Sequence, residues 1–231
     1  TDSKGALHKD TSKAWLRNLD ILAEACKKTD RDLWVIIQAC GNYGIDDGSN
    51  RFCDEPEDMR QQMYASLAFG SKAVIYACYQ TGWWSPDARM IDANGNRTDT
   101  YYSAKTTNDE VAAFKDLYGD YKYLGTHMIN PLKVAGHSHN YLEMSNGCDA
   151  PDVYSTGGLL VGTFVHKDTG KKAYIVTNME ELDKSVTVSA VLNVPGAKNL
   201  TVYQMGKSKD VESGKVKLSL TPGEGVFITE K

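Results

Sequence analysis

Hydrophobic residues in the first half of the chain follow two alternating patterns. Helical spacing predicts helices over residues 12–28, from about residue 54 onward, and over 102–124. Continuous apolar runs at 33–37 and 73–79 predict buried strands between these helices. Because strands of a parallel sheet are apolar on both faces, two such strands, each followed by a helix, predict part of a β/α barrel.

The second half of the chain changes character near Pro131, where β-branched residues, glycines and turn residues become frequent. Alternating apolar and polar positions predict short strands joined by tight turns. The expected strands are 159–166, 172–178, 186–191, 200–203, 216–220 and 226–228. We therefore expect an α/β part, residues 1–130, followed by an all-β part, residues 131–231, that folds as an antiparallel β-sandwich.

The composition is that of an ordinary globular protein, with 231 residues of which 41% are hydrophobic and 24% are charged. A formal net charge of −4 gives no reason to expect nucleic acid as a partner. The longest apolar runs are too short to cross a bilayer, so no membrane partner is expected. Residues 1–10 lack the apolar region of a signal peptide, as would a secreted protein whose signal has been removed.

Three motifs suggest a metal site or a disulfide. Residues 46–50 hint at a calcium loop, but no bidentate glutamate follows at the right spacing. His137 and His139 are two residues apart, so on a strand they could bind a metal from the same face. No third ligand is evident in the sequence. Cys40 and Cys53 could form a disulfide across one loop, although an odd total of five cysteines favours free thiols. We therefore expect no metal and no cofactor.

Three stretches, in this order, resemble parts of bacterial β-galactosidase-like glycoside hydrolases. Residues 60–76 read RQQMYASLAFGSKAVIY and are similar to the seventh helix and eighth strand of their barrel. Residues 90–98 read MIDANGNRT and, with residues 101–102 and 108–110, resemble their last loop and eighth helix. Residues 218–226 read LSLTPGEGV and resemble the closing hairpin of their sandwich. The resemblance implies the C-terminal part of a (β/α)8 TIM barrel followed by an antiparallel β-sandwich.

The resemblance also implies the place of a site. Residues 33–38 correspond to the seventh barrel strand and residues 74–79 to the eighth, and barrel active sites lie at the C-terminal ends of the strands. Aromatic rings stack on sugars, and amide side chains hydrogen-bond to sugar hydroxyls. The candidate substrate-binding residues are Gln38, Asn42, Tyr43, Tyr79, Gln80, Trp83 and Trp84. For each of them, ordinary loop packing or hydrogen bonding is the alternative.

Such families use two carboxylates, usually glutamates at the ends of the fourth and seventh strands. The fourth strand is not in this sequence, and Gln38 stands where the seventh-strand glutamate would often be. An amide can act neither as nucleophile nor as proton donor, so the catalytic residues stay unidentified. One hypothesis is a glycoside hydrolase, or a C-terminal fragment of one, that hydrolyses glycosidic bonds by paired-carboxylate acid/base catalysis. The alternatives are a non-catalytic carbohydrate-binding protein with a degenerate barrel cleft and a structural accessory half.

The expected partners follow from the same resemblance. A carbohydrate would be the substrate. Because two parallel strands cannot close a barrel, a missing N-terminal barrel segment or a partner chain would supply the other strands. The resemblance favours a secreted or periplasmic protein, whereas the residues themselves leave the compartment open.

Overall fold

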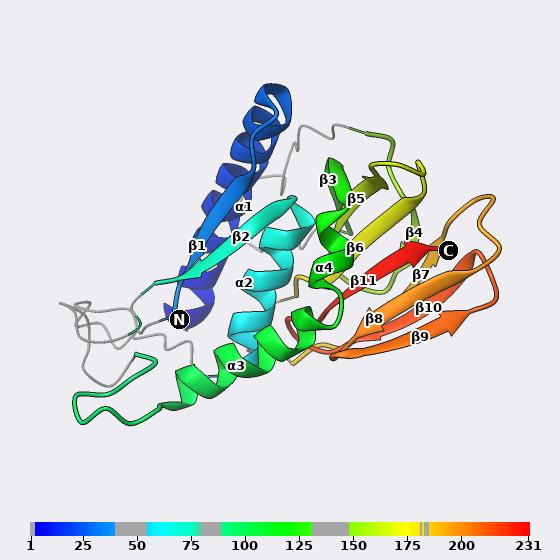
Figure 1. Ribbon diagram of the computed structural model, residues 1–231. Coiled ribbons are helices and arrows are strands. Elements are labelled where there is room, and N and C mark those ends of the chain that lie inside the picture. Colours follow the sequence, from blue (N-terminus) through cyan, green and yellow to red (C-terminus); the bar gives the residue numbers. More distant parts are fainter. Residues whose placement is uncertain are drawn as a thin grey trace.

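The computed structural model describes residues 3–39, 55–77, 79, 89–130, 148–180, 182 and 185–231. Within these residues the chain forms four helices and eleven strands, and the strands belong to three sheets. Figure 1 shows helices between a small two-stranded sheet and the two larger sheets. This layered order packs the first part of the chain against the second.

The first four elements alternate between helix and strand, as the hydrophobic pattern predicted. They are α1 (Ser3–Thr29), β1 (Leu33–Ile37), α2 (Pro56–Ala68) and β2 (Ser71–Tyr76). The two strands pair in parallel, with Ile37 opposite Tyr76. Leu33, Val35 and Ile37 are buried in a hydrophobic core that they share with the helices.

The predicted C-terminal part of a (β/α)8 barrel is wrong. After β2 come α3 (Asp99–Ala112) and α4 (Lys115–Gly119), and the next strand, β3 (Tyr121–Ile129), pairs antiparallel with β5 (Leu159–His166). In the described residues β1 and β2 form a two-stranded sheet, and the other two sheets are antiparallel. The physical reason is that hydrophobic periodicity specifies single elements, whereas a barrel depends on which distant strands pair.

The remaining strands complete two antiparallel sheets. They are β4 (Asp152–Ser155), β6 (Lys172–Asn178), β7 (Val188–Asn193), β8 (Leu200–Gln204), β9 (Lys207–Val211), β10 (Lys215–Leu220) and β11 (Gly225–Glu230). A six-stranded sheet has the order β3-β5-β6-β11-β8-β9, and a three-stranded sheet has the order β10-β7-β4. Val161 and Ile228 of the first share a hydrophobic core with Leu192 and Leu218 of the second. Two antiparallel sheets around one core are the arrangement expected of a β-sandwich.

The helices cover the other face of the six-stranded sheet. Phe227 of this sheet lies in one core with Leu16 of α1 and Tyr64 of α2. The end of α2 comes so close to β5 that a Cβ atom at Gly162 would lie 2.1 Å from the main-chain oxygen of Ala68. Only glycine fits there without a shift of the main chain. This core includes residues on both sides of position 130. The domain boundary expected there stays a prediction.

A buried ion pair fixes α3 on α2. Nε of Arg60 donates to Oε1 and Oε2 of Glu110 at 3.0 and 3.1 Å, and Nη2 of Arg60 donates to Oε1 at 2.7 Å. Both side chains are almost fully buried. Such a two-pronged pair sets distance and orientation together. Because Glu110 lies near the C-terminal end of α3, the pair holds this end of the helix in place relative to α2.

Candidate functional site

Parallel pairing brings the C-terminal ends of β1 and β2 to the same edge of their sheet. The main-chain N–H of Ala77 donates to the oxygen of Ile37 at 2.9 Å, so the pairing continues to the ends of both strands. Gln38 follows β1 directly, and Tyr79 lies three residues after the end of β2. Figure 1 shows both strand ends on the same side as the N-terminal end of α3. The two candidate residues therefore come from adjacent strand ends.

The main chain of Gln38 is held by an amide side chain from α2. Its N–H donates to Oε1 of Gln62 at 2.8 Å, and Nε2 of Gln62 donates back to the oxygen of Gln38 at 3.1 Å. Nε2 of Gln62 also donates to the main-chain oxygen of Asp58 at 3.2 Å. Two opposed hydrogen bonds to one residue are what a neighbouring strand would supply. The end of β1 is therefore fixed in position.

A small hydrophobic cluster lies under these strand ends. Its buried members are Ala39, Met59, Met90 and Ala104, and Tyr76, Ile91 and Tyr101 pack against it. These residues come from the ends of β1 and β2, from α2, from the segment before α3, and from α3 itself. The cluster joins segments that are far apart in the sequence and gives the strand ends a common base.

A short hairpin between the strand ends and α3 is held by an aspartate. Oδ1 of Asp92 accepts hydrogen bonds from the main-chain N–H groups of Asn94 (2.8 Å) and Asn96 (2.7 Å). The side-chain amide of Asn96 donates to Oδ2 at 3.0 Å. The bond from this amide, together with the main-chain bonds, holds the pKa of the Asp92 carboxyl below its usual value. Ile91 and Arg97 pair across the hairpin.

The hairpin is attached to both neighbours. The N–H of Ile91 donates to the main-chain oxygen of Tyr79 at 3.1 Å, which connects the hairpin to the segment after β2. Thr98 begins α3, and its hydroxyl accepts a hydrogen bond from the N–H of Tyr101 at 3.4 Å. Tyr76 of β2 donates from its hydroxyl to Oδ1 of Asn108 in α3 at 2.7 Å, and burial raises the pKa of this tyrosine to about 12.

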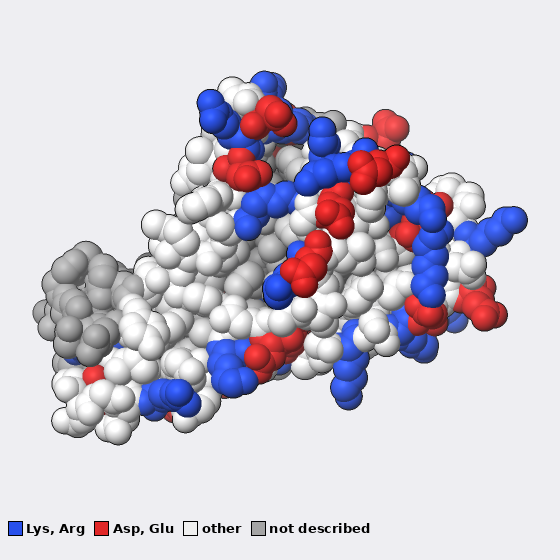
Figure 2. All heavy atoms as spheres, viewed as in Figure 1, with Lys and Arg blue, Asp and Glu red and all other residues white. Residues whose placement is uncertain are grey.

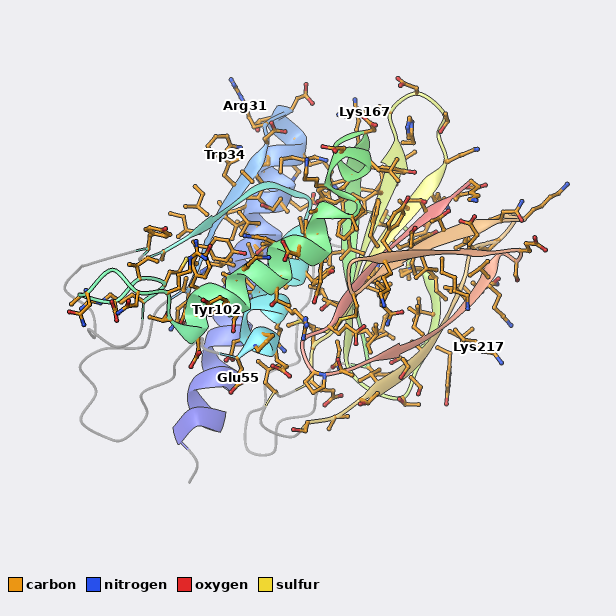
Figure 3. All side chains as sticks on the ribbon, turned by 60° about the horizontal axis from the view of Figure 1, so that its bottom comes forward. Arg31, Trp34, Glu55, Tyr102, Lys167 and Lys217 are labelled. Atoms are coloured by element: carbon orange, nitrogen blue, oxygen red, sulfur yellow. The ribbon has the colours of Figure 1, made fainter. Side chains whose placement is uncertain are left out.

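Aromatic side chains gather on these anchored segments. Tyr79 is 58% exposed and Tyr102 is 52% exposed, although each belongs to a hydrogen-bonded segment. The rings of Tyr101 and Tyr102 meet edge to face at 5.4 Å, and the guanidinium carbon of Arg97 lies 4.7 Å from the centre of the Tyr101 ring. Figure 3 shows Tyr102 on the N-terminal part of α3. We name Gln38, Tyr79, Arg97, Tyr101 and Tyr102 the strand-end surface.

Sequence reasoning found only part of this surface. Gln38 and Tyr79 are brought to one edge of the sheet. Arg97, Tyr101 and Tyr102 were missed as site residues, although two adjacent tyrosines after a polar turn were a visible signal. The other predicted site residues, Asn42, Tyr43, Gln80, Trp83 and Trp84, lie outside the described residues.

The predictions on metal and disulfide fall largely outside the described residues as well, because residues 40–54 and 131–147 are not among them. In the part that is described, no group of three or more His, Cys, Asp or Glu side chains could hold a metal ion. Cys26 and Cys148 are free thiols. No helix among the described elements is long and apolar enough to cross a membrane.

Comparisons with known proteins show a weak likeness to a solved structure. No protein family and no curated protein matches the sequence. A solved structure named "Glycoside hydrolase" aligns with 77% of this chain and 37% of its own length, with a TM-score of 0.36 and 12% sequence identity. The chain thus spans little more than a third of that protein. The likeness does not support the finer resemblance to β-galactosidases, and one this weak carries no argument about activity.

Proposed function

We propose that this chain binds carbohydrate at the strand-end surface, as part of a glycoside-hydrolase-like protein. The observation that carries the proposal is that Tyr79 and Tyr102 are more than half exposed on segments that hydrogen bonds hold in place. An exposed tyrosine on a fixed main chain offers a flat apolar face at little cost in conformational entropy. Sugar rings present apolar C–H faces that stack on such rings.

Polar groups beside the tyrosines suit sugar hydroxyls. Gln38 carries an amide with donors and acceptors, and Arg97 carries a guanidinium that only donates. The Arg97 guanidinium lies against the Tyr101 ring, so its position is restricted. Trp83 and Trp84 follow Tyr79 closely in the sequence and remain predicted stacking residues. Aromatic faces with a few directed polar groups are the usual composition of a small-ligand site.

Hydrolysis by paired carboxylates is the narrower proposal. It requires one carboxylic acid and one carboxylate on either side of the bond to be cleaved. The residue that follows β1 is Gln38, whose amide can take neither role. The binding proposal needs no such pair, and we therefore place it first. The predicted missing segment or partner chain would be the source of the carboxylates.

Calorimetric titration with a panel of β-linked oligosaccharides tests the binding proposal. We expect Tyr79→Ala and Tyr102→Ala each to weaken binding by about 1 kcal/mol, the energy typical of one stacked aromatic ring. Tyr154→Ala is the matched control, because Tyr154 is 71% exposed but lies on β4 of the three-stranded sheet. Unchanged affinity in both site variants would show that the proposal is wrong. Release of reducing sugar by the purified chain would favour the hydrolysis proposal over the proposal of binding without catalysis.

A further inference from the structure

The hairpin held by Asp92 has an Asn-Gly pair in its turn. Asn94 and Gly95 are exposed, as are the residues on either side of them. In Figure 1 this segment projects beyond the N-terminal end of α3, and Figure 2 shows mainly uncharged atoms there. Gly95 has a φ of +84°, and apart from its chain neighbours no atom of the described residues lies within 4 Å of a Cβ built on it. The peptide bond between Asn94 and Gly95 is therefore open to water.

This pair of residues brings two reactive groups together. The side-chain carbonyl carbon of an asparagine and the main-chain nitrogen of the next residue can close a five-membered ring. A side chain on that next residue hinders the closure, and glycine has none. In the sequence, asparagine is followed by glycine at Asn94 and at Asn146, and Asn146 lies outside the described residues. Among the described asparagines, Asn94 therefore has the sequence best suited to ring closure.

Hydrogen bonds or bulky neighbours protect the other described asparagines. Side-chain hydrogen bonds hold Asn96, Asn108, Asn130, Asn178 and Asn193. Asn18 and Asn199 are each followed by a buried leucine, whose side chain hinders ring closure. Asn94 differs in both respects, because glycine follows it and the described residues supply no hydrogen-bond partner for its side chain.

We propose that Asn94 is a modification site: it loses ammonia and forms a cyclic imide with Gly95, which water opens to aspartate or isoaspartate. Hydroxide takes the proton from the main-chain nitrogen of Gly95, and this nitrogen then bonds to Cγ of Asn94. The Cγ–Nδ2 bond breaks, and ammonia leaves with a proton from water. One water molecule adds to either carbonyl carbon of the imide and opens the ring, so the step needs no oxidant or reductant. The inference does not depend on carbohydrate binding.

The turn itself restrains this reaction. The N–H of Gly95 donates to the main-chain oxygen of Asp92 at 3.1 Å, and the nitrogen can attack only after this hydrogen bond opens. Because Gly95 is exposed, water can replace the bond during short local openings. We therefore expect the folded chain to react more slowly than an unstructured peptide of the same sequence. We also expect the rate to increase with pH, since the nitrogen must lose its proton.

The products alter the hairpin that positions Arg97. Oδ1 of Asp92 accepts hydrogen bonds from the main-chain N–H groups of Asn94 and Asn96. Isoaspartate at position 94 adds one carbon to the main chain between these two donors, so they no longer fit a single oxygen together. Both products also place a negative charge near the Asp92 carboxylate. We therefore expect the bond from Asn96 to weaken and the hairpin to loosen.

Peptide mapping by mass spectrometry tests the inference. The purified chain is kept in mildly alkaline buffer beside the synthetic peptide IDANGNRTD, which copies residues 91–99, and is digested at acid pH so that digestion adds no modification. We expect the fragment that contains Asn94 to shift by the mass difference between an amide and an acid, with two products that both map to position 94. Asn96 in the same fragment should stay unmodified. In the converted chain, amide exchange at Asn96 should be faster than in fresh protein.

Asn94→Gln is the matched variant, because it keeps an amide at the exposed position but would have to close a less favourable six-membered ring. We expect no mass shift in this variant during the time in which the unaltered chain is converted. A chain that stays unmodified at Asn94 while the synthetic peptide is fully converted would overturn the proposal. So would a shift that maps to Asn96 or one that persists in Asn94→Gln. Unchanged exchange at Asn96 in the converted chain would contradict the loosening of the hairpin.

Discussion

The two-stranded sheet and the six-stranded sheet contain similar residues but differ in what covers them. In β11, Phe227 and Ile228 point to opposite faces, and both are fully buried between the helices on one side and the three-stranded sheet on the other. In β1, Ile37 is 2% exposed and its neighbour Ile36 is 66% exposed. The difference shows that a strand with apolar side chains on both faces needs a covering layer on each face to bury them. In β1 one face is covered and the other is exposed.

The comparison has an energetic side. Burial of apolar surface contributes roughly 25 cal/mol per Å² to folding, so the exposed faces of Trp34 and Ile36 contribute little to the stability of this chain. The same side chains would contribute when a partner covers them. Substitutions on the two sheets should therefore differ strongly in their effect on the isolated chain.

The largest expected effect is at Phe227. Its ring lies 5.0 Å from that of Phe114 and 5.7 Å from those of Tyr118 and Tyr121, in the core between helices and sheet. We expect Phe227→Ala to lower the free energy of unfolding by about 3–5 kcal/mol, because it leaves a cavity among these rings. Ile36→Ala is the control and should change it by less than about 0.5 kcal/mol. Urea titration of both variants checks this, and equal losses would remove the distinction between the two sheets.

A smaller effect is expected where α2 meets the six-stranded sheet. Gly162→Ala would place a methyl group against the main-chain oxygen of Ala68, and main-chain atoms cannot turn aside as a side chain can. We expect a loss of about 1–3 kcal/mol in the free energy of unfolding. Gly119→Ala is the control, since no atom lies within 4 Å of a Cβ built there. If thermal or urea unfolding found Gly162→Ala as harmless as the control, the close contact would be in doubt.

The smallest effect concerns Lys72, where β2 meets the antiparallel sheet. Its ammonium donates to the main-chain oxygens of Tyr118 (3.2 Å) and Tyr121 (2.8 Å) and lies 4.4 Å from the centre of the Tyr118 ring. Burial, and then the charge of Lys167, lower the pKa of Lys72 to about 8. Between pH 8 and its unfolded pKa of 10.5, the unfolded chain therefore binds more protons than the folded chain.

It follows that Lys72 adds stability as the pH rises through this interval, and that below pH 8 its charge opposes folding. Water still reaches the half-buried amine, so we expect the gain to be only about 1 kcal/mol. Lys72→Met keeps most of the side-chain length and cannot titrate. The difference in unfolding free energy between the two proteins, measured from pH 7 to 11, isolates this group from the tyrosines and Cys148. A difference that does not change with pH would contradict the assignment.

Several elements could be predicted from local pattern alone. The strands at 33–37, 159–166 and 172–178 are confirmed, because each is an apolar run bounded by turns. The helix predicted over residues 12–28 is also present, but it begins earlier, at Ser3. The helix predicted over residues 102–124 is too long. Tyr121 continues its apolar stripe, but the residue starts β3 and pairs with His166. A helical period cannot reveal that a distant strand offers a better set of hydrogen bonds.

The candidate site divides in the same way. Gln38 and Tyr79 were predicted because Gln38 follows one apolar run and Tyr79 ends the other, and strand ends are visible in a sequence. Arg97, Tyr101 and Tyr102 join them only because the hairpin of Asp92 folds back onto the main chain of Tyr79. Their place in the candidate site depends on contacts between separate segments, and local hydrophobic periodicity does not indicate such contacts.

The sequence by itself therefore determined the type and order of most elements, the parallel character of the apolar strands and the antiparallel character of the C-terminal sheets. It could not show β4 and β9, which are short edge strands, and β9, with the sequence Lys-Ser-Lys-Asp-Val, lacks an apolar alternation. Only the tertiary structure decided that β3 leaves the helical part for the six-stranded sheet, and that, among the described residues, no barrel forms and β1 pairs with β2 alone. The physical reason is that side-chain periodicity depends on residues that are close in the sequence. Strand pairing depends on which distant segments come into contact, and local periodicity does not specify them.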